Sequence, residues 1–282
     1  MRKLLDRLLA TVCALAALFV CGVLFGLIAM IWVRGAPAIS WQFLTEQIRQ
    51  VGAEGGIFYN LVGTLILIVT AIAVSAPVAV GLALIERIYL PNGFARRSLT
   101  LFLYTLNGVP SIVFGLFGFV FFVKWLHWDK SWLAGGILLA AMILPTVAVA
   151  LSERIKAIPA KYLEAAASLG LRQRQIVWAV ILPQSWSGLL TGSLLGLARA
   201  AGETAPIMFT ATIFAGASLP HGIKSSPVLS LPYHIFILAQ DSFDPSVGAK
   251  LWGAALVLVA LVLLLSLVAL PSRLKMHEEA NA

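Results

Sequence analysis

Six apolar stretches of membrane-spanning length constrain the fold of this chain more than any other feature of its sequence. A helix needs about 20 predominantly apolar residues to cross the hydrocarbon core of a bilayer. Only 11% of the 282 residues are charged, against about 25% in a typical soluble domain. The sequence therefore predicts an all-α membrane protein, a single transmembrane domain over residues 1–282 with six transmembrane helices. We expect these helices near residues 8–33, 61–85, 99–123, 132–152, 184–214 and 249–271.

Lys and Arg residues are distributed unevenly among the segments that join these stretches. If both termini are inside, the cytoplasmic segments hold thirteen of them, namely Arg2, Lys3, Arg7, Arg87, Arg96, Arg97, Arg154, Lys156, Lys161, Arg172, Arg174, Arg273 and Lys275. The outside segments then hold six, namely Arg34, Arg49, Lys124, Lys130, Lys224 and Lys250. Because cytoplasmic loops carry the excess of basic residues, the sequence predicts an N-in, C-in orientation. The net charge of +8 is explained mostly by this topology, with a small share for membrane lipid, and does not indicate nucleic acid.

Residues 153–183 form a polar segment between the fourth and fifth apolar stretches, with five Lys and Arg residues. Its residues also favour a short helix. Pro159 suits a first helical turn, the Ala-rich run after it favours helix, and Gly170 suits a C-terminal cap. The segment is therefore expected to present a short capped helix to the cytoplasm, where it contacts a partner.

This segment resembles the EAA loop of bacterial ABC-importer permeases. The matching positions are Glu164, Ala165, Ala166, Gly170, Leu182 and Pro183, with Val180 where that family usually has Ile. The resemblance implies a coupling loop that inserts into a groove on a separate ATPase subunit. The sequence itself contains no G-x-x-x-x-G-K-[ST] phosphate-binding loop. We therefore expect a permease subunit that is not an enzyme.

Two charged residues, Arg199 and Glu203, lie inside the fifth apolar stretch. A charge near the membrane centre costs about 2.5–3.5 kcal/mol on insertion scales, and such residues usually face a cavity or a partner. Residues four apart share one helix face, so these two are expected to interact. They are interpreted either as part of a substrate pathway or as an ion pair that only makes insertion tolerable. Beside them, small residues recur every four positions and predict close helix packing, at Gly188, Gly192, Gly196 and Ala200.

The third stretch contains Pro110 and several glycines and is expected to be kinked. Asn107 and Ser111 flank this proline and are candidates to line a cavity. Together, residues 108–118 and 199–206 resemble the permease subunits of the bacterial phosphate-uptake ABC transporter, in particular its PstA-like group. That resemblance implies a MetI-like architecture in the bacterial inner membrane, with Arg199 and Glu203 on the phosphate pathway. It also implies three partners: two copies of an ATPase, a second and different permease, and an external phosphate-binding protein.

No metal site or cofactor is expected, because the four His residues are scattered without the spacing of ligand pairs. Two alternatives stay open from the sequence alone. The first is an importer for another oxyanion, since a buried guanidinium also suits sulfate or molybdate. The second is a secondary transporter or channel that requires no ATPase and has a merely charged loop at 153–183.

Overall fold

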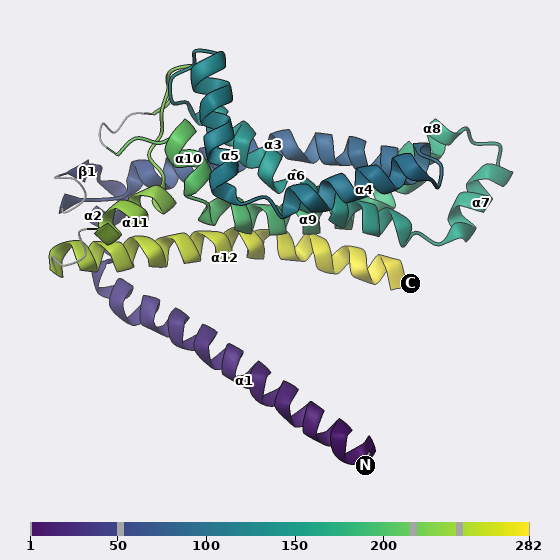
Figure 1. Cartoon of the computed structure of the whole chain (residues 1–282), viewed down its shortest axis with the longest axis horizontal. Coiled ribbons are helices and arrows are strands. Elements are labelled where there is room, and N and C mark those ends of the chain that lie inside the picture. The colour runs from purple at the N-terminus through teal and green to yellow at the C-terminus, as the bar shows by residue number, and fades with distance from the viewer. Residues whose placement is uncertain (1, 50–53, 215–218, 241–244, 282) are drawn as a thin grey trace.

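The computed structural model describes residues 2–49, 54–214, 219–240 and 245–281, and these residues are mostly helical (Figure 1). The α-helices are α1 (Arg2–Gly35), α2 (Trp41–Thr45), α3 (Phe58–Leu84), α4 (Phe94–Asn107), α5 (Ser111–Gly118), α6 (Trp132–Lys156), α7 (Ala160–Ser168), α8 (Gln173–Ile176), α9 (Leu182–Gly202), α10 (Ala205–Thr210), α11 (Leu231–Gln240) and α12 (Pro245–Asn281). A 3-10 turn, η1 (Ala36–Ala38), follows α1. Three π-helical segments continue neighbouring helices, namely η3 (Ile85–Tyr89), η4 (Phe119–Trp125) and η5 (Val177–Ile181). A two-stranded antiparallel ribbon joins β1 (Ile48–Arg49) to β2 (Glu54–Gly55).

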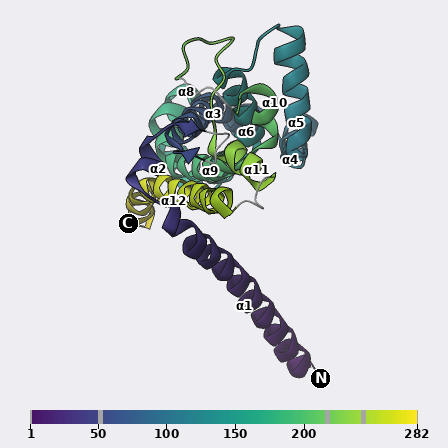
Figure 2. The same ribbon diagram turned by 90° about the vertical axis from the view of Figure 1, so that its left-hand side faces the viewer.

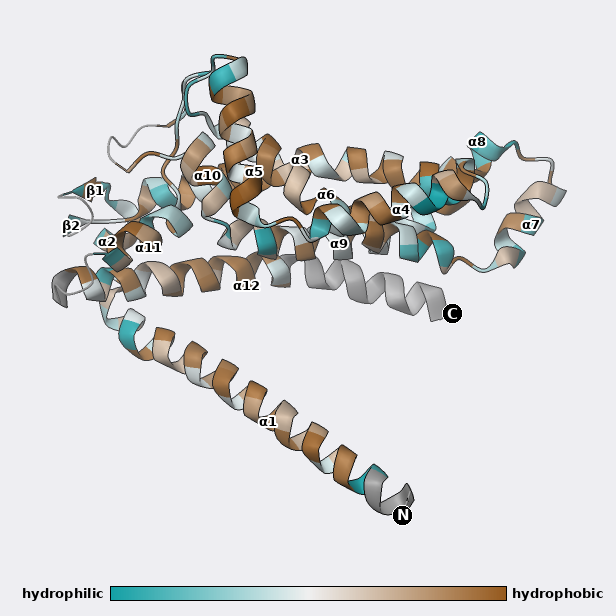
Figure 3. Cartoon of the chain, in the orientation of Figure 1, coloured by the Kyte–Doolittle hydropathy of each residue, from teal (hydrophilic) through white to brown (hydrophobic). Residues whose placement is uncertain are grey.

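Four helical segments of the described chain are long and apolar enough to cross a membrane. They cover Asp6–Ala38, Phe58–Tyr89, Trp132–Lys156 and Val247–Leu267, and they overlap the first, second, fourth and sixth predicted stretches. Hydrophobic residues, coloured brown, predominate along the coloured parts of α1 and α12 (Figure 3). The third predicted stretch adds a fifth span only if two helices joined by a sharp bend are counted together.

This third stretch is broken more severely than the kink predicted for it. Helices α4 and α5 meet at an angle of 94°, and α5 stands nearly upright beside the long axis of the bundle (Figure 1). The fifth predicted stretch is also divided. Helix α9 ends at Gly202 and α10 begins at Ala205. The mean hydropathy of α9 is also below that of the four helices long and apolar enough to span a membrane. Its sequence explains this, because hydroxyl, amide and guanidinium side chains interrupt it.

Helices α3, α6 and α9 form the centre of the bundle, with α12 along one side (Figure 1). The glycine stripe of α9 lies against α6, as the sequence predicts. A Cβ atom on Gly192 would lie 2.9 Å from the Cα of Val147, and one on Gly188 would lie 2.5 Å from the Cβ of Arg154. The two backbones can approach this closely only because glycine has no side chain. Among the main core residues are Leu67, Ala71, Leu139, Ala140, Ile143, Ala200, Ile207, Ala211 and Val228.

Helix α1 leaves the bundle at an angle, and its apolar surface is exposed (Figures 1 and 2). Only its C-terminal end packs closely, where Gly35 lies against Trp252 of α12. A helix that is apolar on all sides and has no protein neighbour is typical of a lipid-facing span. We infer that most of α1 contacts lipid or another protein.

Candidate functional site

The polar cluster described here lies where the third and fifth predicted stretches are both interrupted. Arg199 donates a hydrogen bond from Nη1 to Oδ1 of Asn107 over 2.7 Å. Oγ1 of Thr146 donates to the same Asn107 oxygen over 3.2 Å. The Nε of Arg199 also lies 3.7 Å from Oε1 of Glu203. The Asn107 amide therefore joins α4 to both α6 and α9, whereas the ion pair lies within α9 and its C-cap residue.

Local sequence explains why the backbone is interrupted beside this cluster. Pro110 has no amide hydrogen, and it disfavours helical geometry in the residue before it. Helix α4 therefore ends at Asn107, and α5 starts after the proline, at Ser111. On the other side, Gly202 ends α9, and Pro206 occupies the first turn of α10. Both interruptions leave polar side chains at helix ends.

Close packing holds the two interrupted stretches together beyond the cluster. A Cβ on Gly115 of α5 would lie 2.7 Å from the carbonyl oxygen of Ala205, at the start of α10. Gly118, one turn further, lies similarly close to Leu138 of α6. Helix α5 is therefore seated against α10 and α6, and the position of the break is fixed by backbone contact.

The ion pair in this cluster is loose, and both of its side chains are partly exposed on this chain. The side chains of Arg199 and Glu203 keep 29% and 20% of their exposure, and Asn107 is exposed. A guanidinium has five N–H donors. Among the described residues, the guanidinium of Arg199 makes one hydrogen bond, and Asn107 is its acceptor. The remaining donors of Arg199 are thus available to an anion that reaches this face.

The predicted cavity residue Ser111 is not part of the hydrogen-bonded cluster. It is half-buried at the first position of α5. In the chain outside the gaps of the structure, no hydrogen bond links its side chain to Asn107 or Arg199. The structure therefore brings together three of the four residues proposed from the sequence, namely Asn107, Arg199 and Glu203.

The segment predicted to be a coupling loop, residues 153–183, is mostly helical. Helix α6 continues to Lys156, α7 follows, and α8 and η5 lead into α9, so that few residues of 153–183 are outside helices. Pro159 is the N-cap of α7 and lies just outside its first turn. Gly170 follows the end of α7 with φ +77°, the left-handed conformation expected of a glycine cap.

The EAA residues lie on α7, which projects from one end of the bundle (Figure 1). Glu164, Ala165 and Gly170 are exposed, whereas Ala166 is 5% exposed and faces the protein. Leu182 and Pro183, at the far end of the pattern, start α9 and are half-buried and exposed, respectively. Beneath α7 lies an apolar cluster that includes Leu151, Ile155, Ile158, Val177 and Ile181. The exposed positions are therefore free to contact a partner, while the base of the helix is anchored.

Sequence reasoning missed several polar residues that the structure places at defined positions. Thr146 follows Pro145 within α6, and a proline beside a hydroxyl residue in an apolar stretch was the available signal. Lys130 donates from Nζ to the carbonyl oxygens of Met208 and Thr212, over 2.8 and 2.9 Å. Burial lowers the pKa of this lysine from its ordinary value. It therefore caps the end of α10 with a partly desolvated charge.

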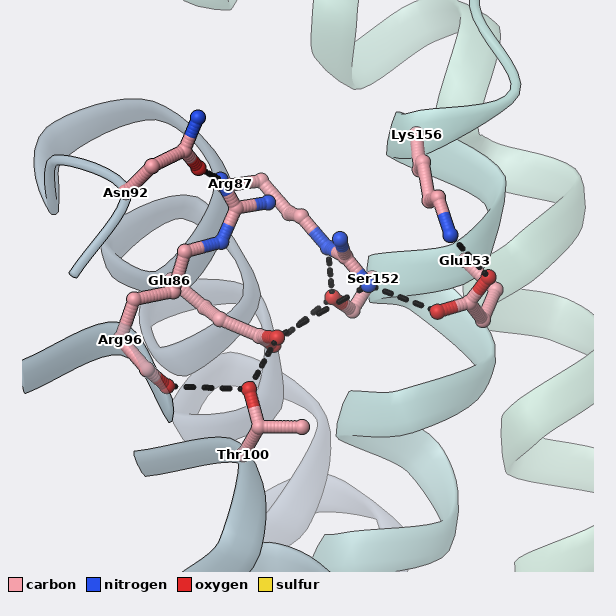
Figure 4. A network of polar contacts seen from close by, with 8 residues as sticks. All are labelled: Glu86, Arg87, Asn92, Arg96, Thr100, Ser152, Glu153 and Lys156. Atoms are coloured by element: carbon pink, nitrogen blue, oxygen red, sulfur yellow. Dashed lines mark hydrogen bonds and ion pairs between the residues drawn. The ribbon is translucent and has the colours of Figure 1, made fainter. Parts of the chain in front are cut away.

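A second missed group surrounds Glu86, a 3%-exposed carboxylate at the end of the second span (Figure 4). It accepts hydrogen bonds from Ser152 and Thr100, and Arg87 beside it binds Ser152 and Glu153. The signal in the sequence was an acidic residue directly after an apolar stretch. No group of three or more His, Cys, Asp or Glu side chains placed to hold a metal occurs in the described part of the chain.

Comparison with protein families matches residues 75–271 to the binding-protein-dependent transport system inner membrane component family. Among curated proteins, the chain is 31% identical over 276 residues to the phosphate transport system permease protein PstA of Pasteurella multocida, covering 95% of this chain and 94% of the relative. It is 34% identical to phosphate transport system permease protein PstA 2 of Mycobacterium bovis, covering 94% and 86%. The probable phosphate transport system permease protein PstA of Methanocaldococcus jannaschii is 35% identical, covering 85% and 83%.

Two solved structures share the fold at low sequence identity. A chain of the MetNI methionine ABC transporter, in an inward-facing conformation, aligns with a TM-score of 0.60 and 16% identity, covering 78% of this chain and 97% of that one. A chain of an amino acid ABC transporter aligns with a TM-score of 0.51 and 15% identity, covering 78% and 92%. The arrangement of helices is therefore that of ABC importer permeases.

Proposed function

This chain belongs to the family of binding-protein-dependent transport system inner membrane components, and from that premise we propose that it is a permease subunit of an ATP-driven importer of inorganic phosphate. The cluster of Arg199, Asn107 and Glu203 carries the proposal. A guanidinium offers planar, paired donors that match the oxygens of phosphate. The guanidinium of Arg199 lies at a break between helices, and several of its N–H donors make no hydrogen bond to the described residues. The relatives named as phosphate permeases support the choice of substrate.

The proposed arrangement in the membrane is six spans with both termini inside a bacterial inner membrane. Counting α9 as a span, with α4 and α5 as one broken span, gives the six. The polar residues of α9 are tolerated because this helix is packed among α3, α6 and α12 rather than surrounded by lipid. Both termini and α7 lie toward the same end of the molecule (Figure 1), which supports placing all three in the cytoplasm.

The proposed partners follow from the exposed α7 and from the incomplete pathway. Helix α7 would dock on one of two ATPase copies through Glu164 and its exposed neighbours. The open face of the Arg199 cluster would be completed by a second, different permease. An external phosphate-binding protein would deliver the anion to the opposite end. Substrate and coupling would thus depend on separate surfaces of this chain.

Substrate identity is tested by labelled uptake in a strain that lacks the chain and is complemented with it. We expect restored phosphate uptake that is competed by unlabelled phosphate and not by sulfate or molybdate. Competition by sulfate or molybdate would assign the importer to another oxyanion. Uptake that persists without any ATPase would favour the secondary-transporter or channel interpretation.

Orientation is tested by cysteine labelling of intact cells after Cys13 and Cys21 are replaced. An impermeant thiol reagent should label Lys224→Cys, in the longest outside segment, and should not label Lys156→Cys at the end of α6. The reverse pattern would contradict the N-in, C-in arrangement.

A further inference from the structure

The buried Glu86 cluster links three helices (Figure 4), and it lies close to the apolar cluster beneath α7. Glu86 lies in η3, directly after α3, and its two carboxylate oxygens accept from different helices. Oε2 accepts from Oγ of Ser152 on α6 over 2.7 Å, and Oε1 accepts from Oγ1 of Thr100 on α4 over 2.8 Å. One buried carboxylate thus ties α3 to both α4 and α6.

The neighbouring Arg87 strengthens the link to α6. Its Nε donates to Ser152 over 2.6 Å, and its Nη2 donates to Glu153 over 2.6 Å. Its guanidinium also lies 3.8 Å from Glu86. Charge-assisted bonds of this kind are shorter and stronger than neutral ones. Ser152 and Glu153 lie only one turn before the end of α6, which leads directly to α7.

The same π-helical segment also touches the chain after α7. Nε2 of Gln173, the first residue of α8, donates to the carbonyl oxygen of Ile88 over 3.4 Å. Apolar contacts reinforce this, since Ile88 and Leu163 both pack against the cluster beneath α7. Segment η3 is therefore attached on both sides of the proposed docking helix.

Thr100 provides the connection toward the substrate site. It precedes Asn107 by seven residues on α4, which is two helical turns, about 10 Å along the axis and nearly the same face. Asn107 in turn holds Arg199. A connection thus runs from the base of α7 through the hydrogen bonds of Ser152, Glu86 and Thr100, and then along two turns of α4 to Asn107 and the guanidinium proposed to bind the anion.

Building on the proposed function, we propose that Glu86 is a positioning residue that transmits the displacement of α7 by its ATPase to α4, and so to the Asn107–Arg199 site. Residues along such a series contact neither ATP nor substrate, so their effect is expected in the coupling between the two sites. The consequence to measure is the number of phosphate ions imported per ATP hydrolysed.

The test uses the assembled transporter with all its subunits. Glu86→Gln removes one of the two acceptors, and we expect the import-to-hydrolysis ratio to fall about fivefold or more, the range of typical allosteric coupling, while ATP hydrolysis continues. Thr100→Val is a milder second variant that removes the hydroxyl that reaches both Glu86 and the Arg96 carbonyl on α4. Its matched control is Thr70→Val on α3, a similarly buried hydroxyl that donates only to the Ile66 carbonyl, and this variant should keep the wild-type ratio.

A second readout does not depend on the identity of the substrate. In a cysteine-free transporter, the labelling rate of Ser111→Cys should change when ATP is added, and Glu86→Gln should abolish that change. A wild-type ratio and a normal ATP response in both Glu86→Gln and Thr100→Val would overturn the proposal. Equal losses of import and hydrolysis, with an unchanged ratio, would also overturn it. If the wild-type transporter imports no phosphate but shows the ATP response, the proposed substrate fails and the transmission role stands.

Discussion

Arg199 is the residue on which the proposed transport chemistry depends. Its guanidinium is oriented by Asn107 and only loosely paired with Glu203. Arg199→Gln should therefore lower phosphate uptake by about tenfold or more, because a hydrogen bond to a charged group contributes about 1.5–3 kcal/mol. Arg199→Lys should recover only part, since an ammonium lacks the planar fork. Uptake must be divided by the amount of complex in the membrane.

Glu203 is expected to weaken the hold of Arg199 on the anion. Glu203→Gln should slow turnover or trap phosphate rather than copy the loss of Arg199. If the pair is only structural, each single change lowers the amount of complex, and the double change restores both amount and uptake. That restoration would contradict the pathway role. Glu46→Gln and Arg49→Gln, in an exposed pair with a separation of 3.0 Å, are matched controls that should have no effect.

His234 predicts how the stability of the chain depends on pH. It is 2% exposed on α11, and burial, followed by the charge of Lys250, lowers its pKa from 6.5 to about 4. The unfolded chain therefore binds a proton between these values while the folded chain does not. Stability is complete above about pH 6.5 and falls by about 3 kcal/mol as the pH drops to about 4.

Thermal unfolding of the purified chain in detergent, from pH 4 to 7, measures this dependence. His234→Gln should flatten it over that range. His127→Gln, at an exposed histidine in the segment before α6, should leave it unchanged. A wild-type slope in His234→Gln would assign the pH dependence to other groups.

At the scale of elements, the packing of α9 on α6 is expected to be intolerant of any side chain. Gly192→Ala would place a Cβ 2.9 Å from the Val147 Cα, so the helices must separate, and we expect a loss of about 1–3 kcal/mol. Gly81→Ala, on α3, meets nothing within 4 Å and should be neutral or stabilising, because alanine favours helix. Unfolding temperatures of the two variants in detergent distinguish them. Equal temperatures would contradict close packing at Gly192.

The turn after α7 is expected to matter for coupling but not for folding. Gly170 is exposed, and a Cβ there meets nothing within 4 Å, so the substitution adds only the local strain of a side chain at φ +77°, about 1–2 kcal/mol. Gly170→Asp should abolish transport while membrane insertion is preserved, because it places charge and bulk on the surface that docks the ATPase. Gly93→Asp, at an equally open glycine before α4, is the control and should transport normally. Transport by Gly170→Asp at the wild-type rate would exclude this docking role.

The sequence predicted these elements with different success, for physical reasons. Apolar length is a local property, so the second and fourth spans were found close to their observed limits. The bend of 94° between α4 and α5 was not predicted. Pro110 only permits a break in the helix, and the angle of that break depends on how Gly115 and Gly118 pack against α10 and α6. The low hydropathy of α9 was not predicted for a related reason. Polar residues are tolerated in α9 because neighbouring helices pack against it, and this packing cannot be inferred from the sequence of α9 alone.

At the scale of the whole molecule, the site was predicted in part. Arg199 and Glu203 were found because charge inside an apolar stretch is unusual in any context. Thr146 and the Glu86 cluster were not found, because their partners are distant in the sequence and only the packing of α3, α4 and α6 brings them together. The helix α7 was predicted because its sequence pattern is local and resembles that of a known family, and its docking role stays a prediction.

The central claim is that this chain moves phosphate only as part of an ATP-driven complex. Labelled phosphate uptake into proteoliposomes tests it most directly, with the purified chain alone compared with the chain plus ATPase, second permease and phosphate-binding protein. We predict uptake only by the full complex and only with hydrolysable ATP. Uptake by the chain alone down a phosphate gradient, or uptake by the complex without ATP, would contradict the account.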